Sequence, residues 1–421
     1  MSKHILMLLE NNSYPQAGRA RREATALIEA GYRVTVIAPT TGDTPHRDRI
    51  NGVDVLRYQR PRQGKGLLGY LWQYGYTLIM HTMLAWLVLF RTGFDVIHAH
   101  NPPDVLVLVA LPFKRLLGKK FVFDHHNLAL EMYDSCANGK PNKHVQRWLL
   151  YFEKLSCQVA DRIITTNQSY KEIVMKRSNV SEKQITIVRN GPEPERIRPV
   201  APDPQLRAKS PNLLGYVGKM DMHNGVDHLL FALSHLKHDL GRTDFYAVLI
   251  GAGDEWDQLR ALAKRLDIAE LVWFTGRVSD EALVRYLSTV DVCVGPDPYN
   301  AFNDRSTRIK ITEFMTLGKP IVAFALTEHQ VTAQESAVYV PGNDIQAFAR
   351  ALSDLFDDPE ARELMGRFGR KRAETTLTWP NSVPPLLNLY ADLFGRKPIT
   401  ERQKLALSRK YAQQHAKASS Q

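Results

Sequence analysis

The segment "NDRSTRIKITEFMTLGKPIVAF", residues 303–324, carries residue types that can bind an anionic ligand. Thr307, Lys310 and Glu313 are spaced three apart, so they share one face of a helix near its start. The first N–H groups of a helix are unpaired and its dipole is positive there, which favours an anion. The segment therefore predicts an anion site. The open alternative is an exposed Lys310–Glu313 ion pair contributing about 0.2–0.5 kcal/mol.

The flanks of this segment suggest where the helix begins and ends. Asp304 or Ser306 can cap its N-terminus by accepting bonds from backbone N–H groups. The helix then runs to about Leu317, and Gly318 ends it. We expect the apolar residues Ile311, Phe314 and Met315 to pack its other face.

A second polar group follows another apolar run. "LLGYVGKM" (213–220) reads as a strand that ends in Gly218 and Lys219, and a loop leads from there into a helix. A glycine lets backbone approach a phosphate, and the Lys219 ammonium can neutralise diphosphate charge. "LIGAGDEWDQL" and "FTGRVSDEAL" repeat the order strand, glycine, acidic residue, helix. If these are strand ends of one sheet, they converge on one cleft.

The elements that must position these groups alternate along the chain. Short apolar runs are separated by segments such as "RARREATALIEAGY", whose apolar residues recur at three and four. This alternation predicts parallel sheets covered by helices on both faces. The first set of runs covers 4–9, 33–38, 54–57, 95–98, 105–110, 120–123 and 162–165; the second covers 212–218, 245–251, 271–276, 290–296, 319–324 and 337–340.

The chain is long enough for two domains. At 421 residues it exceeds one ordinary core. The segment 188–205 holds five prolines and separates the two sets of strands, so we place the linker there. The predicted fold class is α/β: two doubly wound, Rossmann-like domains facing a cleft. In such sheets ligands bind beyond the carboxyl ends of the strands.

One stretch departs from the alternation. Residues 66–90 contain no Asp, Glu, Lys or Arg and are long enough to span a bilayer. Spanning would separate strands that must share one sheet, so we expect a helix lying on the domain or in the membrane interface. A buried core helix is the alternative. Basic residues suited to anionic headgroups flank the stretch: Arg60, Arg62, Lys65, Arg91 and the run 113–120.

Charge and cysteine content narrow the class of protein. The net charge is +11, and residues 395–421 hold seven Lys/Arg against one Glu, which suits a solvated end or an anionic surface. The sequence shows no zinc-finger or RRM pattern, so nucleic acid is not an expected partner. Three cysteines without paired spacing predict neither a disulfide framework nor a zinc site, and they fit a reducing compartment. The start "MSKHILMLLENN" reads as a strand rather than a signal peptide.

The ordered motifs resemble a known family. "YVGKM…NGVDHLLFAL", "AVLIGAGDEWDQL", "FTGRVSDEALVRYLSTVDVCVGP" and "STRIKITEFMTLGKPIVAF" are similar to family 4 (group 1) glycosyltransferases of the GT-B fold. "RREATALIEAGYRVTVIAP", "FDVIHAHNPPDVL" and "VFDHHNLALEMY" are similar to that family's first domain, so the resemblance covers about residues 3–390. It implies transfer of a sugar from a nucleotide-diphospho-sugar with retention of anomeric configuration, no metal site and no cofactor.

The resemblance implies donor-binding roles. Glu313 matches the glutamate that accepts bonds from the donor ribose, and Lys219 matches a residue that holds the diphosphate. The backbone of Arg277–Val278 matches the contacts to the nucleobase. The sequence departs from the family at two positions: the first motif glutamate is Arg305, beside Asp304, and the second basic residue is Asn224. The predicted donor site comprises Gly218, Lys219, Arg277, Val278, Asp304, Ser306, Thr307, Lys310 and Glu313, with Lys310 compensating for Asn224.

The resemblance also assigns residues in the first half. His126 in "DHHN" matches the histidine that contacts the transferred sugar; the alternative is a histidine satisfied by Asp124 or by backbone. His125 points the opposite way in a strand end. Gly18 is a candidate to approach the phosphate or the acceptor. His100 and Asn101, in "HNPPD" at the end of a predicted strand, are candidates to line the acceptor site, or they merely turn the chain. With Glu313, His126 makes up the predicted catalytic pair.

These observations combine into one hypothesis. We expect an acceptor domain (1–195), a donor domain (196–375), a helix packing back toward the first domain (376–395) and a basic tail (396–421). The expected enzyme is a cytoplasmic hexosyltransferase, peripheral at the inner face of the membrane, that extends a lipid-linked saccharide in cell-surface polysaccharide biosynthesis. Two rivals stay open: a GT-B nucleotide-sugar epimerase, and a catalytically inert membrane-bound partner suggested by Arg305 and Asn224.

Overall fold

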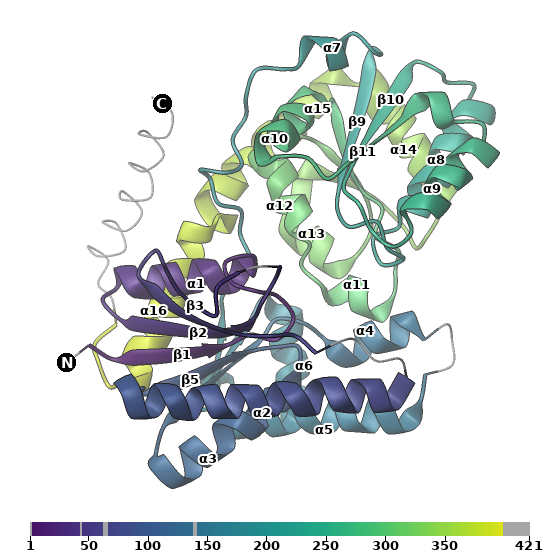
Figure 1. Ribbon diagram of the computed structural model, residues 1–421. Helices are drawn as coiled ribbons and strands as arrows, with labels where there is room; N and C mark the ends of the chain where they lie inside the picture. Colours follow the sequence, from purple (N-terminus) through teal and green to yellow (C-terminus); the bar gives the residue numbers. More distant parts are fainter. Residues whose placement is uncertain (1, 43, 62–65, 138–140, 399–421) are drawn as a thin grey trace. The chain divides into compact units, whose positions relative to one another are not determined.

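The computed structural model describes residues 2–42, 44–61, 66–137 and 141–398, and the chain divides into two compact units. Within the described range, the first unit comprises residues 2–189 and 382–398, and the second comprises 190–381. The predicted tail from 399 onward, Arg62 and Lys65 lie outside the described residues. Figure 1 labels the elements used below.

The first unit is built on an eight-stranded sheet with the order β3-β4-β2-β1-β5-β6-β7-β8. Only β3 runs antiparallel to its neighbour, and the other pairs are parallel. The order reverses between β1 and β5, which makes this the topological switch point of the sheet. The strands are β1 His4–Leu8, β2 Arg33–Pro39, β3 Arg47–Ile50, β4 Val53–Tyr58, β5 Val96–His100, β6 Lys120–His125, β7 Arg162–Thr165 and β8 Ile185–Ile187.

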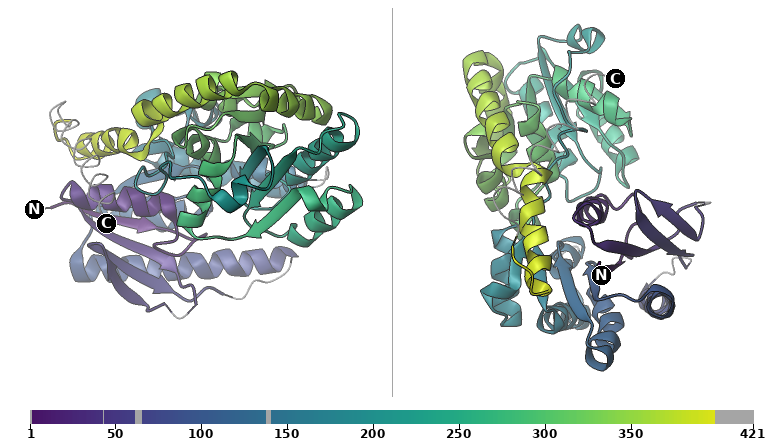
Figure 2. Two further views of the ribbon diagram at one scale, coloured as in Figure 1. Left: turned by 90° about the horizontal axis from the view of Figure 1, so that it is seen from above. Right: turned by 90° about the vertical axis from the view of Figure 1, so that its left-hand side faces the viewer.

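Helices cover this sheet on both faces, as the two views of Figure 2 show. Figure 1 shows α2, α3 and α5 along one face, where they pack over the buried side chains of the central strands. The helices of the unit are α1 Gly18–Glu29, α2 Gly66–Thr92, α3 Val107–Leu117, α4 Ala129–Cys136, α5 Lys143–Val159, α6 Gln168–Ser178 and, from residue 382 on, α16 Trp379–Leu393; short 3₁₀ turns span Asp104–Leu106 and Glu182–Gln184.

The second unit has a six-stranded, all-parallel sheet with the order β11-β10-β9-β12-β13-β14. Its switch point lies between β9 and β12. Alternate strand residues enter two separate core clusters: Leu214 and Tyr216 in one, Leu213 and Cys293 in the other. Both faces are therefore buried. The strands are β9 Asn212–Val217, β10 Phe245–Ile250, β11 Val272–Gly276, β12 Val292–Gly295, β13 Ile321–Phe324 and β14 Ala337–Val340.

Short helices connect the strands of the second unit. They are α7 Pro204–Arg207, α8 Val226–His238, α9 Trp256–Arg265, α10 Asp280–Thr289, α11 Ala301–Arg305, α12 Ile309–Thr316, α13 Thr327–Ala333, α14 Ile345–Asp357 and α15 Pro359–Arg372; 3₁₀ turns span Ala269–Leu271 and Gln334–Ser336, and a π-helical turn spans Ala373–Leu377. The α/β class and the two doubly wound sheets confirm the prediction.

One predicted strand is wrong. Residues 105–110, "VLVLVA", form the end of a 3₁₀ turn and the start of α3. A short continuous apolar run has no period of its own, so it fits a buried strand or a buried helix equally well. Here Leu106, Val107 and Ala110 are buried against the sheet, whereas Leu108 is 39% exposed, which is the periodicity of a helix.

The apolar stretch 66–90 lies within the single 27-residue helix α2. Thr77, His81, Ala85 and Val88, spaced four, four and three apart, form its buried face. The opposite face is also apolar yet exposed: Trp72, Ile79, Met83 and Phe90 are between 60% and 79% exposed. Among the described residues, no helix combines the length and the apolar character that crossing a bilayer requires.

Candidate active site

In the second unit, the residues after β9 form a tightly packed glycine turn. The Gly218 N–H donates to the Ile250 carbonyl at 3.0 Å. Gly251 has a φ of +138°, and a Cβ there would lie 1.9 Å from the Gly218 carbonyl oxygen. Only glycine at 251 allows the ends of β9 and β10 to approach this closely. The turn therefore fixes where Lys219 leaves the sheet.

Lys219 is a surface residue at this strand end. Its side chain is 56% exposed, and its Nζ lies 3.2 Å from Asp254 Oδ2 and 3.6 Å from Asp221 Oδ2. The Asp254 side chain is 87% exposed, so exchanging this partner for a phosphate costs little. The predicted diphosphate role of Lys219 is compatible with this geometry and stays a prediction.

The predicted helix, expected to run from about residue 306 to Leu317, is α12, which begins later, at Ile309, and a separate short helix, α11 (Ala301–Arg305), precedes it. Asn300 caps α11 through its Oδ1, which accepts from the N–H groups of Phe302 and Asn303. Ser306 Oγ donates back to the Phe302 carbonyl, and Asp304 Oδ1 accepts from the Thr327 N–H. Neither predicted cap serves α12. The extended backbone at the C-cap of α11 and at the N-cap of α12 breaks the helix.

Helix α12 begins without a side-chain cap. Arg308 occupies its N-cap position, in extended conformation, and makes no capping hydrogen bond with its side chain. The Arg308 side chain therefore accepts no bond from the first N–H groups of α12, and the Ile311 N–H donates to the Arg308 carbonyl at 3.2 Å. A helix start without a side-chain cap is a position where an anion can accept the remaining N–H groups. Thr307, just before the helix, donates from Oγ1 to Glu328 Oε2 at 3.2 Å.

Lys310 is buried and paired with Asp297, a residue that the sequence reasoning missed. The side chains are 6% and 0% exposed, and Lys310 Nζ lies 2.8 Å from Asp297 Oδ2. Arg308 Nε lies 3.3 Å from the other carboxylate oxygen. Burial lowers the pKa of Lys310, and Asp297 opposes that shift. The cluster holds two cations against one carboxylate, so it carries a surplus positive charge.

Glu313 is buried as well and contacts Arg196. Its Oε1 accepts from Arg196 Nη1 at 2.8 Å, and Arg196 Nε also lies 2.9 Å from Asp280 Oδ2. The alternative of an exposed Lys310–Glu313 pair is therefore wrong, because both side chains are buried and each binds another residue. Whether Glu313 also accepts bonds from a ribose stays a prediction.

The remaining donor residues lie after β11. Arg277 follows Gly276, the last residue of β11, and is exposed, while Val278 packs against the margin of a core cluster. Asp297, by contrast, could have been found in the sequence: "VGPDPYN" puts it directly after the apolar run of β12, at the switch point. The partnership of Arg196 with Glu313 has no such signal, because the two are 117 residues apart.

In the first unit, Asp124 at the end of β6 organises the predicted catalytic histidine. It is fully buried and accepts two bonds from Arg19, from Nε at 2.7 Å and from Nη2 at 2.9 Å. His126 Nδ1 lies 3.2 Å from Asp124 Oδ2, and the His126 side chain is 19% exposed. Burial lowers the pKa of His126 and Asp124 opposes that shift, so the imidazole is neutral near pH 7.

The loop that carries His126 is clamped by Asn101. Asn101 Oδ1 accepts from the N–H groups of His126 and Asn127, and its Nδ2 donates to Asp104 Oδ1 and to the Asn127 carbonyl. Asn101 is 1% exposed and His100 is 4% exposed. Neither faces open solvent, and His100 Nδ1 lies 2.9 Å from Asp124 Oδ2. The predicted place of His100 and Asn101 in an acceptor or phosphate loop stays a prediction. His125 points away, toward Glu153, as the strand alternation predicted.

Gly18, by contrast, opens α1 with free space around it. A Cβ at this position would meet nothing within 4 Å. The next residue, Arg19, turns inward to Asp124. The structure thus leaves room beside Gly18 for a ligand, and its predicted role there stays a prediction.

A cluster in the first unit has ligand types that suit a metal. Glu23, His98, His100 and Asp124 are buried, and one ligand atom of each lies within 4.8 Å of the others. Arg19 lies among them and reaches both carboxylates, with Nη2 3.0 Å from Glu23 Oε1. Burial raises the pKa of Glu23 to about 7. A guanidinium already supplies positive charge between the carboxylates, and the expectation of no metal stays a prediction.

Two family models match this chain. The model of Glycosyltransferase Family 4 matches residues 18–196, and that of Glycosyl transferases group 1 matches residues 211–358. The chain belongs to the family 4, group 1 glycosyltransferases. It is thus a glycosyltransferase, and the resemblance inferred from its motifs is confirmed.

Relatives and solved structures agree with this family. The glycosyltransferase is 21% identical over 311 residues to an uncharacterized glycosyltransferase of Methanocaldococcus jannaschii, covering 72% of this chain and 77% of that protein. Its fold is similar to sucrose-phosphate synthase from Thermosynechococcus elongatus (TM-score 0.77, 21% identity, 93% and 99% of the two chains). It is also similar to Anabaena HepE in complex with UDP-glucose (TM-score 0.67, 15% identity, 93% and 99%). The fold is GT-B.

Proposed function

We propose that this glycosyltransferase moves a sugar, with retention of anomeric configuration, from a nucleotide-diphospho-sugar to a hydroxyl of a lipid-linked saccharide in cell-surface glycan synthesis. The donor part of this proposal rests on the buried cluster of Lys310, Arg308 and Asp297 at the switch point of the second unit, which has a surplus positive charge. The uncapped start of α12 lies in the same segment. Anabaena HepE, which shares this fold, was solved with UDP-glucose.

The chemistry needs charge stabilisation more than a protein nucleophile. Breaking the donor bond develops negative charge on the leaving diphosphate, and fixed cations and N–H groups stabilise it as it forms. Lys219, the Arg308–Lys310 cluster and the α12 amides are the groups proposed for this role. The acceptor hydroxyl then attacks the oxocarbenium-like sugar from the face that the diphosphate leaves, and its proton passes to an oxygen of the departing diphosphate. His126, neutral and partly exposed, is proposed to contact that sugar.

The proposal includes no metal cofactor, because the lysine and arginine side chains supply the positive charge that a divalent ion would otherwise provide at the diphosphate. Titration of the full chain with UDP, GDP and ADP, followed by incubation with the corresponding sugar nucleotides with and without EDTA, tests this. Binding of one diphosphate and slow, EDTA-insensitive release of free sugar with unchanged anomeric configuration support the proposal. A returned sugar nucleotide with altered configuration makes the protein an epimerase, and no binding or turnover refutes a donor site.

The lipid-linked acceptor and the membrane location rest on the first unit. The exposed apolar face of α2 is accompanied by Leu116 on α3, 77% exposed, and Trp148 on α5, 60% exposed. Arg115 is exposed in the last turn of α3, next to Leu116 in the chain, and the partly exposed Lys119 follows that helix. Exposed apolar side chains beside cationic ones are the combination that binds an anionic interface, and stable anchoring generally takes both signals.

Vesicle sedimentation tests the membrane proposal. The full chain should sediment with anionic vesicles at low salt and be partly released at high salt, because screening weakens the cationic contribution. Phe90→Glu, on the outer face of α2, should abolish most of this binding. Leu364→Glu is the matched control, since Leu364 is a 53% exposed residue of α15 in the second unit. Equal binding by both variants, or none by the native chain, would remove the α2 face from the proposal.

A further inference from the structure

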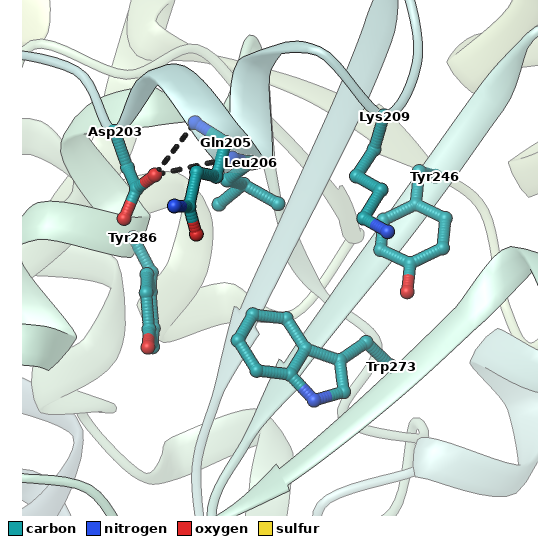
Figure 3. A pocket seen from close by; sticks show the side chains of 7 residues that line it. All are labelled: Asp203, Gln205, Leu206, Lys209, Tyr246, Trp273 and Tyr286. Carbon is teal, nitrogen blue, oxygen red and sulfur yellow. Dashed lines mark hydrogen bonds between the residues drawn. The ribbon is translucent and has the colours of Figure 1, made fainter.

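A pocket of about 310 Å³ lies in the second unit, apart from the predicted donor residues. Tyr246 and Trp273 are each the second residue of their strands, β10 and β11, so the pocket lies at the amino ends of these strands. Arg277 lies four residues beyond Trp273, past the carboxyl end of β11. Figure 3 shows the lining residues: Asp203, Gln205, Leu206, Lys209, Tyr246, Trp273 and Tyr286.

Three aromatic rings form the apolar wall of the pocket, and they come from three elements. Tyr246 is on β10, Trp273 on β11 and Tyr286 on α10. The Trp273 and Tyr286 ring centroids are 5.1 Å apart with an interplanar angle of 62°, so the two rings form a corner. All three are only partly buried at the margin of a core cluster. Tyr and Trp at such a position present an apolar face and a polar edge to a ligand.

The other four lining residues come from α7 and its flanks, and three of them are polar. Asp203 caps α7, with its Oδ1 accepting from the N–H groups of Gln205 and Leu206 at 2.9 and 3.1 Å. Gln205 and Lys209 are exposed, and Figure 3 shows their side chains among the lining residues. One carboxylate and one ammonium leave the lining without net charge, so it does not select an anion. An amide, a carboxylate and an ammonium offer hydrogen bonds of both kinds.

We propose that this pocket is an accessory saccharide-binding subsite, where the C–H face of a pyranose ring packs on Trp273 and its hydroxyls bond to Asp203, Gln205 and Lys209. A pyranose has an apolar face and a polar perimeter, which matches a lining that combines three aromatic rings with three polar side chains. The volume is at the lower end of the range for small-molecule sites, roughly 300–1,000 Å³, and suits one or two sugar rings. The inference rests on the proposed function in one respect: the saccharide is a distant part of the glycan that the enzyme extends.

Binding is measured on the full chain without any sugar nucleotide, by saturation-transfer NMR and calorimetry. The probes are maltohexaose, mannohexaose and chitohexaose, with uridine and adenosine as planar aromatic competitors. At least one hexasaccharide should bind, and Trp273→Leu should weaken that binding about tenfold, because the pyranose loses the flat apolar face on which it packs. Phe231→Leu is the control: Phe231 is a 37% exposed aromatic residue on α8, outside the lining.

Gln205→Ala keeps the test decisive if Trp273→Leu fails to fold. Gln205 is exposed, so this substitution should weaken saccharide binding without a loss of stability. No binding of any hexasaccharide, equal binding by the Trp273 and Phe231 variants, or Trp273-dependent binding of a nucleoside instead would each overturn the subsite. Donor hydrolysis should be unchanged in Trp273→Leu. An absence of nucleoside diphosphate binding would refute the proposed function alone, because the saccharide assay contains no donor.

Discussion

Glu313→Ala separates the two roles that Glu313 can play in the second unit. If it accepts bonds from the donor ribose, its removal should weaken binding of the preferred nucleoside diphosphate by about 1.5–3 kcal/mol, the range for hydrogen bonds to a charged group. That is roughly 12- to 150-fold, at 1.4 kcal/mol per factor of ten. The cost to folding should be smaller, because Arg196 is 35% exposed and keeps Asp280 as a partner.

Arg196→Met is the matched control for this substitution. It removes the same ion pair but leaves the Glu313 carboxylate in place. If the carboxylate serves the ribose, Arg196→Met should change nucleotide affinity far less than Glu313→Ala does. If the carboxylate serves only Arg196, the two variants should lose similar stability and neither should lose nucleotide affinity.

The assay is calorimetric titration with the nucleoside diphosphate and with its 2′,3′-dideoxy analogue. In the native chain the analogue should bind more weakly by about the factor lost in Glu313→Ala. In Glu313→Ala itself the two ligands should bind almost equally, because residues and hydroxyls that interact are not additive. A folded Glu313→Ala variant that still discriminates against the dideoxy analogue to the native extent would refute the ribose contact.

Two further predictions concern the buried carboxylates. Asp124→Asn and His126→Ala should each lower kcat strongly while nucleoside diphosphate affinity barely moves. Burial lowers the pKa of His126 and Asp124 opposes that shift, so Asp124→Asn should lower this pKa further and move the acidic limb of the pH–rate profile to lower pH. A limb shifted to higher pH would contradict this. Lys310→Met should destabilise the second unit by about 3–5 kcal/mol in denaturant titration, because Asp297 loses a buried partner. Lys310→Met combined with Asp297→Asn should recover part of that loss. Strictly additive effects in the double variant would show that the pair is not coupled.

The fold could be predicted from the sequence because parallel sheets leave a local signal. Strands buried on both faces read as continuous apolar runs, and the helices between them show their own period. The signal fails where an apolar run is short enough to fit either a strand or part of a helix. The run 105–110 is such a case, since it leads into helix α3. It also misses strands that are partly exposed: β3, Arg47–Ile50, has no buried residue.

The candidate site was predicted in part, and the errors have one cause. Spacing along a helix shows which residues share a face, but it does not show what that face packs against. Lys310 and Glu313 share a face as predicted, yet their partners are Asp297 and Arg196, which other segments supply. The cap prediction was wrong for the same reason: Asp304 accepts a hydrogen bond from the Thr327 N–H, on another segment, and does not cap the helix.

The two units share one arrangement at the carboxyl ends of their strands: a buried carboxylate paired with a cation. Each holds a fully buried carboxylate that a cation from another segment neutralises: Asp124 with Arg19, and Asp297 with Lys310. Such pairs add little net stability, because desolvation offsets most of their attraction, whereas losing one partner is costly. Their consequence is therefore geometric. Asp124 orients the His126 ring through Nδ1, and Asp297 fixes Lys310 at the start of α12, so that the groups proposed to meet the substrate are held before it binds.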